Sequence, residues 1–291
     1  MTGNSAQEIT FEFYRYNPNL AAAIIFAALF GLVTVIHIYR VIRTKTWYFV
    51  PFLIGGVFEV IGYVGRILSS RESPNWTMGP YIIQTLFLLL APALFAASIY
   101  MELGRIIFLV NGESRSLIKR KWLTKTFVTG DVLSFLMQAG GGGIMTQSLH
   151  TGQYVVIGGL AVQLLFFGFF MATAVTFHTR IHQRPTNTSI SVPWSRHQYA
   201  LYLASILILV RSVFRVIEYV EGNDGFLLRH EYFLYIFDAA LMWSTMALFL
   251  VVPPGQLTQM LAEGKREDIS RSSDLGYEMV ITRESQPDKY V

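Results

Sequence analysis

Ionisable and aromatic side chains recur at helical spacing in one late stretch of the chain, residues 211–238. They are Arg211, Arg215, Glu218 and Tyr219 before the turn signal EGNDG, and Glu231, Tyr235 and Asp238 after it. Steps of i, i+4 and i+7 place each set on or beside one face of a helix, and the Gly/Asn/Asp turn joins the two helices as a hairpin. Two charged faces would therefore meet, and they could pair with one another or hold the charged head of a ligand.

Two further helical faces carry the same chemistry earlier in the chain. Glu59, Tyr63 and Arg66 follow i, i+4, i+7 spacing, and Asp131 shares a face with Gln138. We predict a polar cavity inside a helix bundle, lined by Glu59, Tyr63, Arg66, Asp131, Gln138, Arg211, Arg215, Glu218, Tyr219 and Asp238. The alternative is a set of ion pairs that only fasten the helices, although small residues fasten helices at lower cost.

The elements that must position these faces are membrane spans. The chain has 291 residues, of which 53% are hydrophobic and only 14% are charged, a composition typical of membrane proteins. An all-α polytopic fold with seven transmembrane helices is predicted, because seven apolar segments reach the roughly 20 residues that a bilayer requires. These segments are 19–40, 47–68, 80–103, 126–147, 152–177, 198–220 and 231–252.

Three regions follow from this pattern of apolar segments. We expect an extracellular N-terminus at 1–18, a membrane domain at 19–255, and a cytoplasmic tail at 256–291 that is polar and predicted to be disordered. The first span follows a polar segment without a basic leader, so it is predicted to be a retained span rather than a cleaved signal peptide.

The distribution of basic residues predicts the orientation of the membrane domain. Alternate loops and the tail hold Arg40, Arg43, Lys45, Arg105, Arg115, Lys119, Arg120, Lys121, Lys125, Arg180, Arg184, Arg196, Lys265, Arg266, Arg271, Arg283 and Lys289. The opposite loops hold only Arg15, Arg71 and Arg229. By the positive-inside rule, the N-terminus lies outside and the C-terminus lies in the cytoplasm. The net charge of +4 follows this topology, and no nucleic-acid partner is predicted.

Proline and glycine shape two of the predicted helices. Pro92 lies inside 80–103 and predicts a kink at mid-depth. The run Gly140, Gly141, Gly142 and Gly143 lies near the end of 126–147 and weakens that helix, by about 1 kcal/mol per glycine relative to alanine in water. The run is interpreted either as close helix packing or as a hinge whose backbone lines a cavity.

Several other chemistries are disfavoured by the residue types present. The chain has no cysteine, which excludes disulfides, a thiol nucleophile and a thiolate metal site. His178 and His182 at i, i+4 spacing, with Asp131 and Glu102 at a similar depth, could bind zinc. However, no HExxH motif supports a metallohydrolase, and no GxxxxGK[ST] motif supports ATP-driven pumping by this chain alone. We predict no metal, no cofactor and no enzymatic activity.

Four ordered motifs resemble a known family. They are FEVIGYVGRI (Phe58 to Ile67), GDVLSFLMQAGGGGI (Gly130 to Ile144), RSVFRVIEYVEGNDG (Arg211 to Gly225) and HEYFLYIFDAALM (His230 to Met242). Together they are similar to the fungal lipid-translocating exporter family, which includes sphingoid long-chain base exporters and 7-aminocholesterol-resistance proteins. The resemblance covers about residues 20–255. It implies seven spans, an outer N-terminus, and export or translocation of lipids and toxic amphiphiles.

The predicted function is therefore translocation of lipids or amphiphilic compounds through a polar cavity in the outer half of the bundle. One alternative is a seven-helix receptor or sensor of amphiphiles that triggers a resistance response, although topology alone is only an analogy and no NPxxY motif ends the last helix. An intramembrane metal-dependent hydrolase is a more distant alternative. We expect the plasma membrane, with an internal membrane as the alternative. The partners would be membrane lipids or amphiphilic small molecules, and the oligomeric state is left open.

Overall fold

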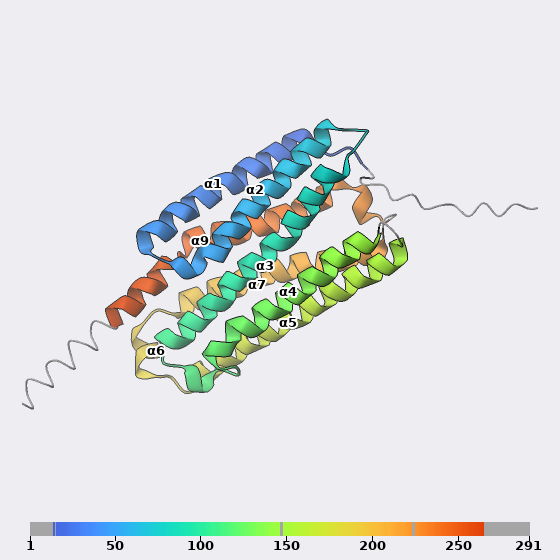
Figure 1. Ribbon diagram of the computed structural model, residues 1–291. Coiled ribbons are helices and arrows are strands. Elements are labelled where there is room, and N and C mark those ends of the chain that lie inside the picture. Colours follow the sequence, from blue (N-terminus) through green and yellow to red (C-terminus); the bar gives the residue numbers. More distant parts are fainter. Residues whose placement is uncertain (1–13, 15, 146–147, 223–224, 265–291) are drawn as a thin grey trace, which may run out of the picture.

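The protein is described by a computed structural model that covers residues 14, 16–145, 148–222 and 225–264. Within these residues every regular element is helical and no strand occurs. The all-α prediction is thereby confirmed for the described part of the chain. Figure 1 shows one elongated bundle of long helices joined by short connections.

The helices follow the predicted spans closely. In chain order they are α1 (Leu20–Thr44), η1 (Trp47–Phe49), α2 (Val50–Arg71), α3 (Met78–Leu109), η2 (Glu113–Arg115), α4 (Arg120–Met145), α5 (Leu149–Gln183), α6 (Asn187–Ser191), α7 (Ser195–Glu221), η3 (Leu227–Arg229), α8 (Glu231–Leu234), η4 (Tyr235–Ala240) and α9 (Leu241–Val251). The last three are contiguous and form one rod, with η4 as a π-helical turn inside it. The predicted EGNDG turn joins α7 to this rod, and its residues 223–224 lie outside the described part.

Six helical segments of the described chain are long and apolar enough to cross a membrane. They are Leu20–Thr44, Trp47–Arg71, Met78–Leu109, His150–Gln183, Ser195–Glu221 and Glu231–Gly264, and they coincide with six of the predicted spans. The remaining predicted span, 126–147, is represented by α4, which is long but is not among the six. A seventh crossing and the orientation of the two termini stay predictions.

The middle of the bundle is formed by α3 and α7. They lie between the α1 and α2 pair and the antiparallel pair α4 and α5 (Figure 1), while α9 packs against α1 and α7. The described chain enters the bundle where α1 begins, and residue 264 lies at the opposite end. We call these the N-terminal end and the C-terminal end of the bundle. The connection from α7 to α8 lies at the N-terminal end (Figure 1).

Aromatic rings pack the bundle toward its C-terminal end. The ring centroid of Phe52 lies 4.3 Å from that of Phe49, 4.6 Å from that of Phe95 and 5.3 Å from that of Phe249, and all four side chains are buried. Such ring clusters contribute large apolar contact areas and a fixed mutual geometry. They hold α2, α3 and α9 together at this end, whereas Arg66 of α2 and Arg215 of α7 lie toward the other end of the bundle.

Proline ends the last span, as the sequence predicts. Val252 leaves the helical conformation directly before Pro253 and Pro254. Residues 255–264 then form a further helical stretch. The segment 256–291 was predicted to be disordered, and the structure corrects this for its first part, because the prolines interrupt the helix without preventing a new one. Residues 265–291 lie outside the described part.

The glycine run of α4 serves close packing at one position. A Cβ on Gly141 would lie 2.8 Å from the backbone nitrogen of Val156 and 2.9 Å from the carbonyl oxygen of Gly152, both in α5. A Cβ on Gly140, Gly142 or Gly143 would meet nothing within 4 Å. The contact geometry therefore supports the packing interpretation at Gly141, where the backbones of α4 and α5 approach each other.

Alanine substitutions in this run should have opposite effects at adjacent positions. Gly141→Ala is expected to lower the free energy of unfolding by about 1–3 kcal/mol, because the new methyl group must push the two backbones apart. Gly142→Ala is the matched control and should be neutral or stabilising by up to about 1 kcal/mol, since alanine favours the helix. Denaturant unfolding of the purified protein in detergent measures both. Equal losses at the two positions would instead favour a hinge.

Candidate functional site

Arg211 is the centre of the polar interior. It lies in the middle of α7 and is only 2% exposed. Its Nε donates a hydrogen bond to Oδ1 of Asp238 at 2.5 Å, and its Nη2 donates to the carbonyl oxygen of Leu88 at 2.7 Å. A buried guanidinium needs a compensating charge and hydrogen-bond acceptors. Asp238 of η4 supplies the charge, and the Leu88 carbonyl of α3 supplies a further acceptor.

The acceptor in α3 is free because of Pro92. In an α-helix the carbonyl of residue 88 would accept from the backbone N–H of residue 92, which proline lacks. α3 nevertheless runs from Met78 to Leu109 as one helix with Pro92 inside it. The kink at Pro92 stays a prediction, and the proline has a second role, since it leaves the Leu88 carbonyl available to Arg211.

Asp238 is presented by an irregular turn. It lies in η4, the π-helical turn between α8 and α9. Single π-turns inside α-helices alter which way the following side chains point and often occur at functional sites. Here the turn coincides with the residue that pairs with Arg211. The sequence spacing placed Asp238 on the correct face but gave no indication of this turn.

Glu59 and Tyr63 of α2 complete this central cluster. The charges nearest Glu59 are those of Asp238 and Arg211, and the Tyr63 hydroxyl is close to Glu59 and Asp238. Glu59 is 1% exposed, and its Oε1 atom finds no hydrogen-bond partner among the described residues. The faces of α2, α7 and η4 therefore meet in the interior, as the predicted cavity requires.

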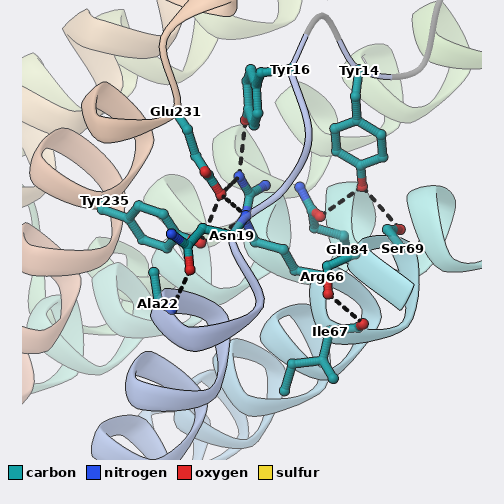
Figure 2. Close-up of polar contacts among 11 residues, drawn as sticks. Tyr14, Tyr16, Asn19, Ala22, Arg66, Ile67, Ser69, Gln84, Glu231 and Tyr235 are labelled. Carbon is teal, nitrogen blue, oxygen red and sulfur yellow. Dashed lines mark hydrogen bonds and ion pairs between the residues drawn. The ribbon is translucent and has the colours of Figure 1, made fainter. Parts of the chain in front are cut away.

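A second cluster surrounds Arg66 near the N-terminal end of the bundle (Figure 2). Its Nη2 lies 2.7 Å from Oε1 of Glu231 and donates to the hydroxyl of Tyr16 at 2.9 Å, while its Nε donates to the hydroxyl of Tyr235 at 3.0 Å. Glu231 also accepts a bond from the backbone nitrogen of Asn19 at 2.8 Å. The cluster therefore ties α2, α8 and η4 to the segment that precedes α1.

Tyr14 attaches the same segment to α2 and α3. Its hydroxyl lies 2.8 Å from Oε1 of Gln84 and 3.1 Å from the hydroxyl of Ser69 (Figure 2). Burial raises the pKa of the Tyr14 hydroxyl and also that of Tyr16. Both phenols therefore stay protonated over the physiological range and serve as neutral hydrogen-bonding groups.

A cavity of about 130 Å³ lies between these two clusters and the end of α7, several times the volume that one water molecule needs. Its polar lining consists of Tyr14, Tyr16, Tyr81, Gln84, Thr85, Gln153, Arg215, Glu218, Tyr219, His230 and Asp238. Its apolar lining consists of Leu88, Met145, Phe214, Leu227, Leu228 and Leu234. The cavity reaches from the segment before α1 inward to Leu88 and Asp238, beside Arg211.

Arg215 and Glu218 form the ionic wall of this cavity. Nη1 of Arg215 donates to Oε2 of Glu218 at 2.6 Å, within one turn of α7. The Arg215 guanidinium also lies over the ring of Tyr219, 5.7 Å from its centroid. The wall thus offers a carboxylate, a guanidinium and a tyrosine face side by side, which suits a ligand head that carries an ammonium or hydroxyl groups.

Six of the ten predicted cavity residues do not line the cavity: Glu59, Tyr63, Arg66 and Arg211 lie in the two clusters beside it, and Asp131 and Gln138 lie elsewhere. Nε2 of Gln138 donates to Ser134 at 2.6 Å and to Gln163 of α5 at 3.2 Å, so this residue joins α4 to α5. Asp131 is buried beside Tyr100 of α3. Neither residue lines the cavity described above. The polar face of α4 packs against its neighbours, while the other predicted residues gather around Arg66, Arg211 and the cavity.

Sequence reasoning missed several residues of the site. Tyr14, Tyr16 and Tyr81 line the cavity, and the aromatic-rich sequence just before Pro18 is the available signal for the first two, because tyrosines favour membrane interfaces. Glu102 and His197 form a buried pair toward the C-terminal end, with Nδ1 of His197 3.5 Å from Oε1 of Glu102. They lie too far apart in sequence for spacing to reveal the pair.

The histidines considered as zinc ligands have other neighbours. His178 stacks on Tyr202, and its Nδ1 lies 3.1 Å from the Tyr202 hydroxyl. Glu102 faces His197 rather than His178. Within the residues that the structure describes, no group of three His, Cys, Asp or Glu side chains could hold a metal ion.

Comparison with known proteins finds one matching family and several similar fungal proteins. Residues 52–260 match the family described as RTA1 like protein. The chain is 36% identical to protoporphyrin uptake protein 1 of Saccharomyces cerevisiae over 85% of this chain and 93% of the relative. It is 31% identical to the probable lipid transporter atnI of Emericella nidulans, over 84% and 68%. It is 26% identical to the sphingoid long-chain base transporter RSB1 of S. cerevisiae, over 82% and 72%. No solved structure matches.

Proposed function

Because the chain belongs to the RTA1-like protein family, an integral membrane family with relatives named as lipid transporters, we propose that it moves lipids or other amphiphiles across a membrane. The observation that carries this proposal is the cavity between Tyr16 and Asp238. It combines a carboxylate, a guanidinium and several tyrosines with an apolar wall, in a bundle whose helices expose apolar side chains.

The substrate class follows from the lining of the cavity. An amphiphile such as a sphingoid base has an ammonium and hydroxyl groups on an acyl chain. Glu218 and Asp238 would attract the ammonium, and the ring of Tyr219 would add a cation–π contact. Arg215 would orient Glu218 or meet a phosphate. The apolar side of the cavity, with Leu234, would guide the start of the acyl chain.

The proposed topology has seven crossings, with α4 as the one not included among the six apolar spans. Val132, Leu133 and Leu136 of α4 are 51%, 49% and 61% exposed, while Asp131 and Ser134 are buried. An apolar outer face with a polar inner face is typical of a membrane helix in a bundle. With seven crossings, the positive-inside rule supports an outer position for the cavity, and the proposed location is the plasma membrane.

Reconstitution separates a translocator from a receptor. We expect proteoliposomes that contain the purified full-length protein to move a fluorescent long-chain base between leaflets about tenfold faster than protein-free liposomes, a change that corresponds to ~1.4 kcal/mol in the barrier. Quenching of the outer leaflet by a membrane-impermeant reductant measures this rate. A sensor would bind the labelled base, as measured by fluorescence anisotropy, and leave the rate at the protein-free value. That outcome would contradict the proposal.

A further inference from the structure

The charges around Arg211 do not balance. Two carboxyl groups, those of Glu59 and Asp238, share the surroundings of this single guanidinium, and only Asp238 is hydrogen-bonded to it. The other arginines inside the bundle have carboxylate partners of their own, namely Glu231 for Arg66 and Glu218 for Arg215. An ionised Glu59 would therefore be uncompensated in a buried site, which costs several kcal/mol. A protonated, neutral Glu59 avoids this cost.

The remaining surroundings of Glu59 offer no other compensation. Its own helix contributes Tyr63, which is neutral. On α1, His37 packs against Phe52 of α2, and its Nε2 donates to the Met246 carbonyl oxygen at 2.9 Å. The side chains of α3 that pack against the glycines of α2 on either side of Glu59 are apolar, among them Leu88 and Phe95. Arg211 and Asp238 are thus the charged groups that act on the buried Glu59 side chain.

The cavity gives protons access to Glu59. Asp238 lines the cavity and also adjoins Glu59. A proton that enters from the N-terminal end can therefore reach Glu59 by way of Asp238, the lining carboxyl group at the inner end of the cavity. Carboxyl groups inside a membrane bundle that face a polar cavity commonly bind transported ions or protons.

Further buried polar groups lie toward the C-terminal end, beyond the ring pair of Phe52 and Phe95. Ser98 of α3 and Ser205 of α7 are buried, and their hydroxyls find no hydrogen-bond partner among the described residues. One turn beyond Ser98 lies Glu102, which faces His197 of α7 at an ion-pair distance. Both are at most 1% exposed. Asp, Glu and His side chains inside a membrane bundle form proton relays in pumps and transporters, and Glu102 and His197 are groups of this kind.

We propose that Glu59 is the proton-binding group of a proton-coupled exchange, in which a cationic amphiphile enters the cavity as the proton leaves toward Glu102 and His197. This inference rests on the proposed function. An ammonium beside Asp238 supplies the positive charge that the proton on Glu59 supplied before. Release breaks the O–H bond of the Glu59 carboxyl and passes the proton onward, and the return step re-forms that bond. No other bond and no electron is involved.

The exchange can be measured with a probe whose own charge is independent of pH. Full-length protein is reconstituted into liposomes with an imposed pH gradient, and accumulation of a fluorescent long-chain quaternary ammonium is recorded. At one proton per probe, a gradient of one pH unit should change the accumulation ratio about tenfold for the wild-type protein. Glu59→Gln, which resembles the protonated carboxyl in size and charge, should give the same ratio with and without the gradient. Protein-free liposomes correct for passive distribution.

Two further variants make the result specific. Glu113→Gln changes a half-exposed carboxylate that pairs with Arg120 outside the bundle, and it should keep the full response to the gradient. Glu59→Asp retains a titratable group and should keep part of the response. A gradient response that persists in Glu59→Gln, or that is lost equally in Glu113→Gln, would overturn the proposal.

Infrared spectroscopy of the purified protein tests the proton on Glu59 without any transport. The difference spectrum between acidic and alkaline buffer should contain the C=O stretching band of a protonated carboxylic acid, and Glu59→Gln should remove one component of it. An unchanged band overturns the assignment to Glu59. If wild-type proteoliposomes accumulate no probe, the proposed function and the exchange both fail, and the infrared band still decides whether Glu59 holds a proton.

Discussion

Replacing Arg211 with methionine is expected to lower the free energy of unfolding by about 3–5 kcal/mol, because Asp238 would keep a buried charge without its partner. The two side chains are each only 2% exposed, and the bond between them is short. The Leu88 carbonyl oxygen would also lose the hydrogen bond that it accepts from Arg211 of α7. Unfolding of the detergent-solubilised protein, followed by thermal or denaturant titration, measures the loss.

The double variant Arg211→Met/Asp238→Leu is the control for this prediction. Replacing both members of a buried ion pair with apolar residues of similar size is often neutral or stabilising. We therefore expect the double variant to recover most of the stability that the single variant loses. A double variant as unstable as Arg211→Met would show that the arginine contributes through packing or through Leu88 rather than through its charge pair.

Glu218→Gln is expected to reduce the rate of amphiphile movement about tenfold or more, since a hydrogen bond to a charged group contributes ~1.5–3 kcal/mol. The glutamine keeps the size of the side chain and still accepts a bond from Arg215, so the fold should be preserved. Glu218 lies on the cavity wall, and the substitution removes only its charge. The liposome assay with a fluorescent long-chain base gives the rate, and surface expression in cells confirms that the protein is intact.

Glu221→Gln is the matched control in the same helix. Glu221 lies one turn beyond Glu218, is exposed, and accepts a bond from the backbone nitrogen of Leu227 rather than lining the cavity. Its substitution should leave the rate unchanged. A rate for Glu218→Gln equal to that of the wild type, or an equal loss in both variants, would remove Glu218 from the proposed binding site.

Helical spacing was sufficient to find most of the buried carboxylates and arginines. It predicted which face each of Glu59, Arg66, Arg211 and Asp238 occupies, since one face of a membrane helix must hold whatever lipid cannot solvate. Spacing could not predict which acid pairs with which base. It gives the position of a residue around its own helix, but not how that helix is rotated relative to its neighbours. The arginines of α2 and α7 therefore proved to pair mainly with acids of the last rod.

The same limit explains the residues of α4. Asp131 and Gln138 share an inward face, as the period requires, but that face meets α5 and α3 rather than α2 and α7. Close approach at Gly141 brings the backbone of α5 against that of α4. The π-turn at Asp238 and the contacts of Tyr14 were also beyond sequence reasoning, because both depend on tertiary packing.

Pro92 of α3 determines which donor the Leu88 carbonyl accepts from, the backbone of its own helix or the side chain of Arg211. An engineer seeking a more stable protein would replace Pro92 with alanine, since proline is the poorest residue for a helix interior. The alanine would supply the missing N–H and recapture the carbonyl of Leu88, which Arg211 uses as an acceptor. The substitution would stabilise α3 but remove a hydrogen bond from Arg211. A change that favours the helix would therefore disturb the buried cluster of Arg211, Asp238 and Glu59.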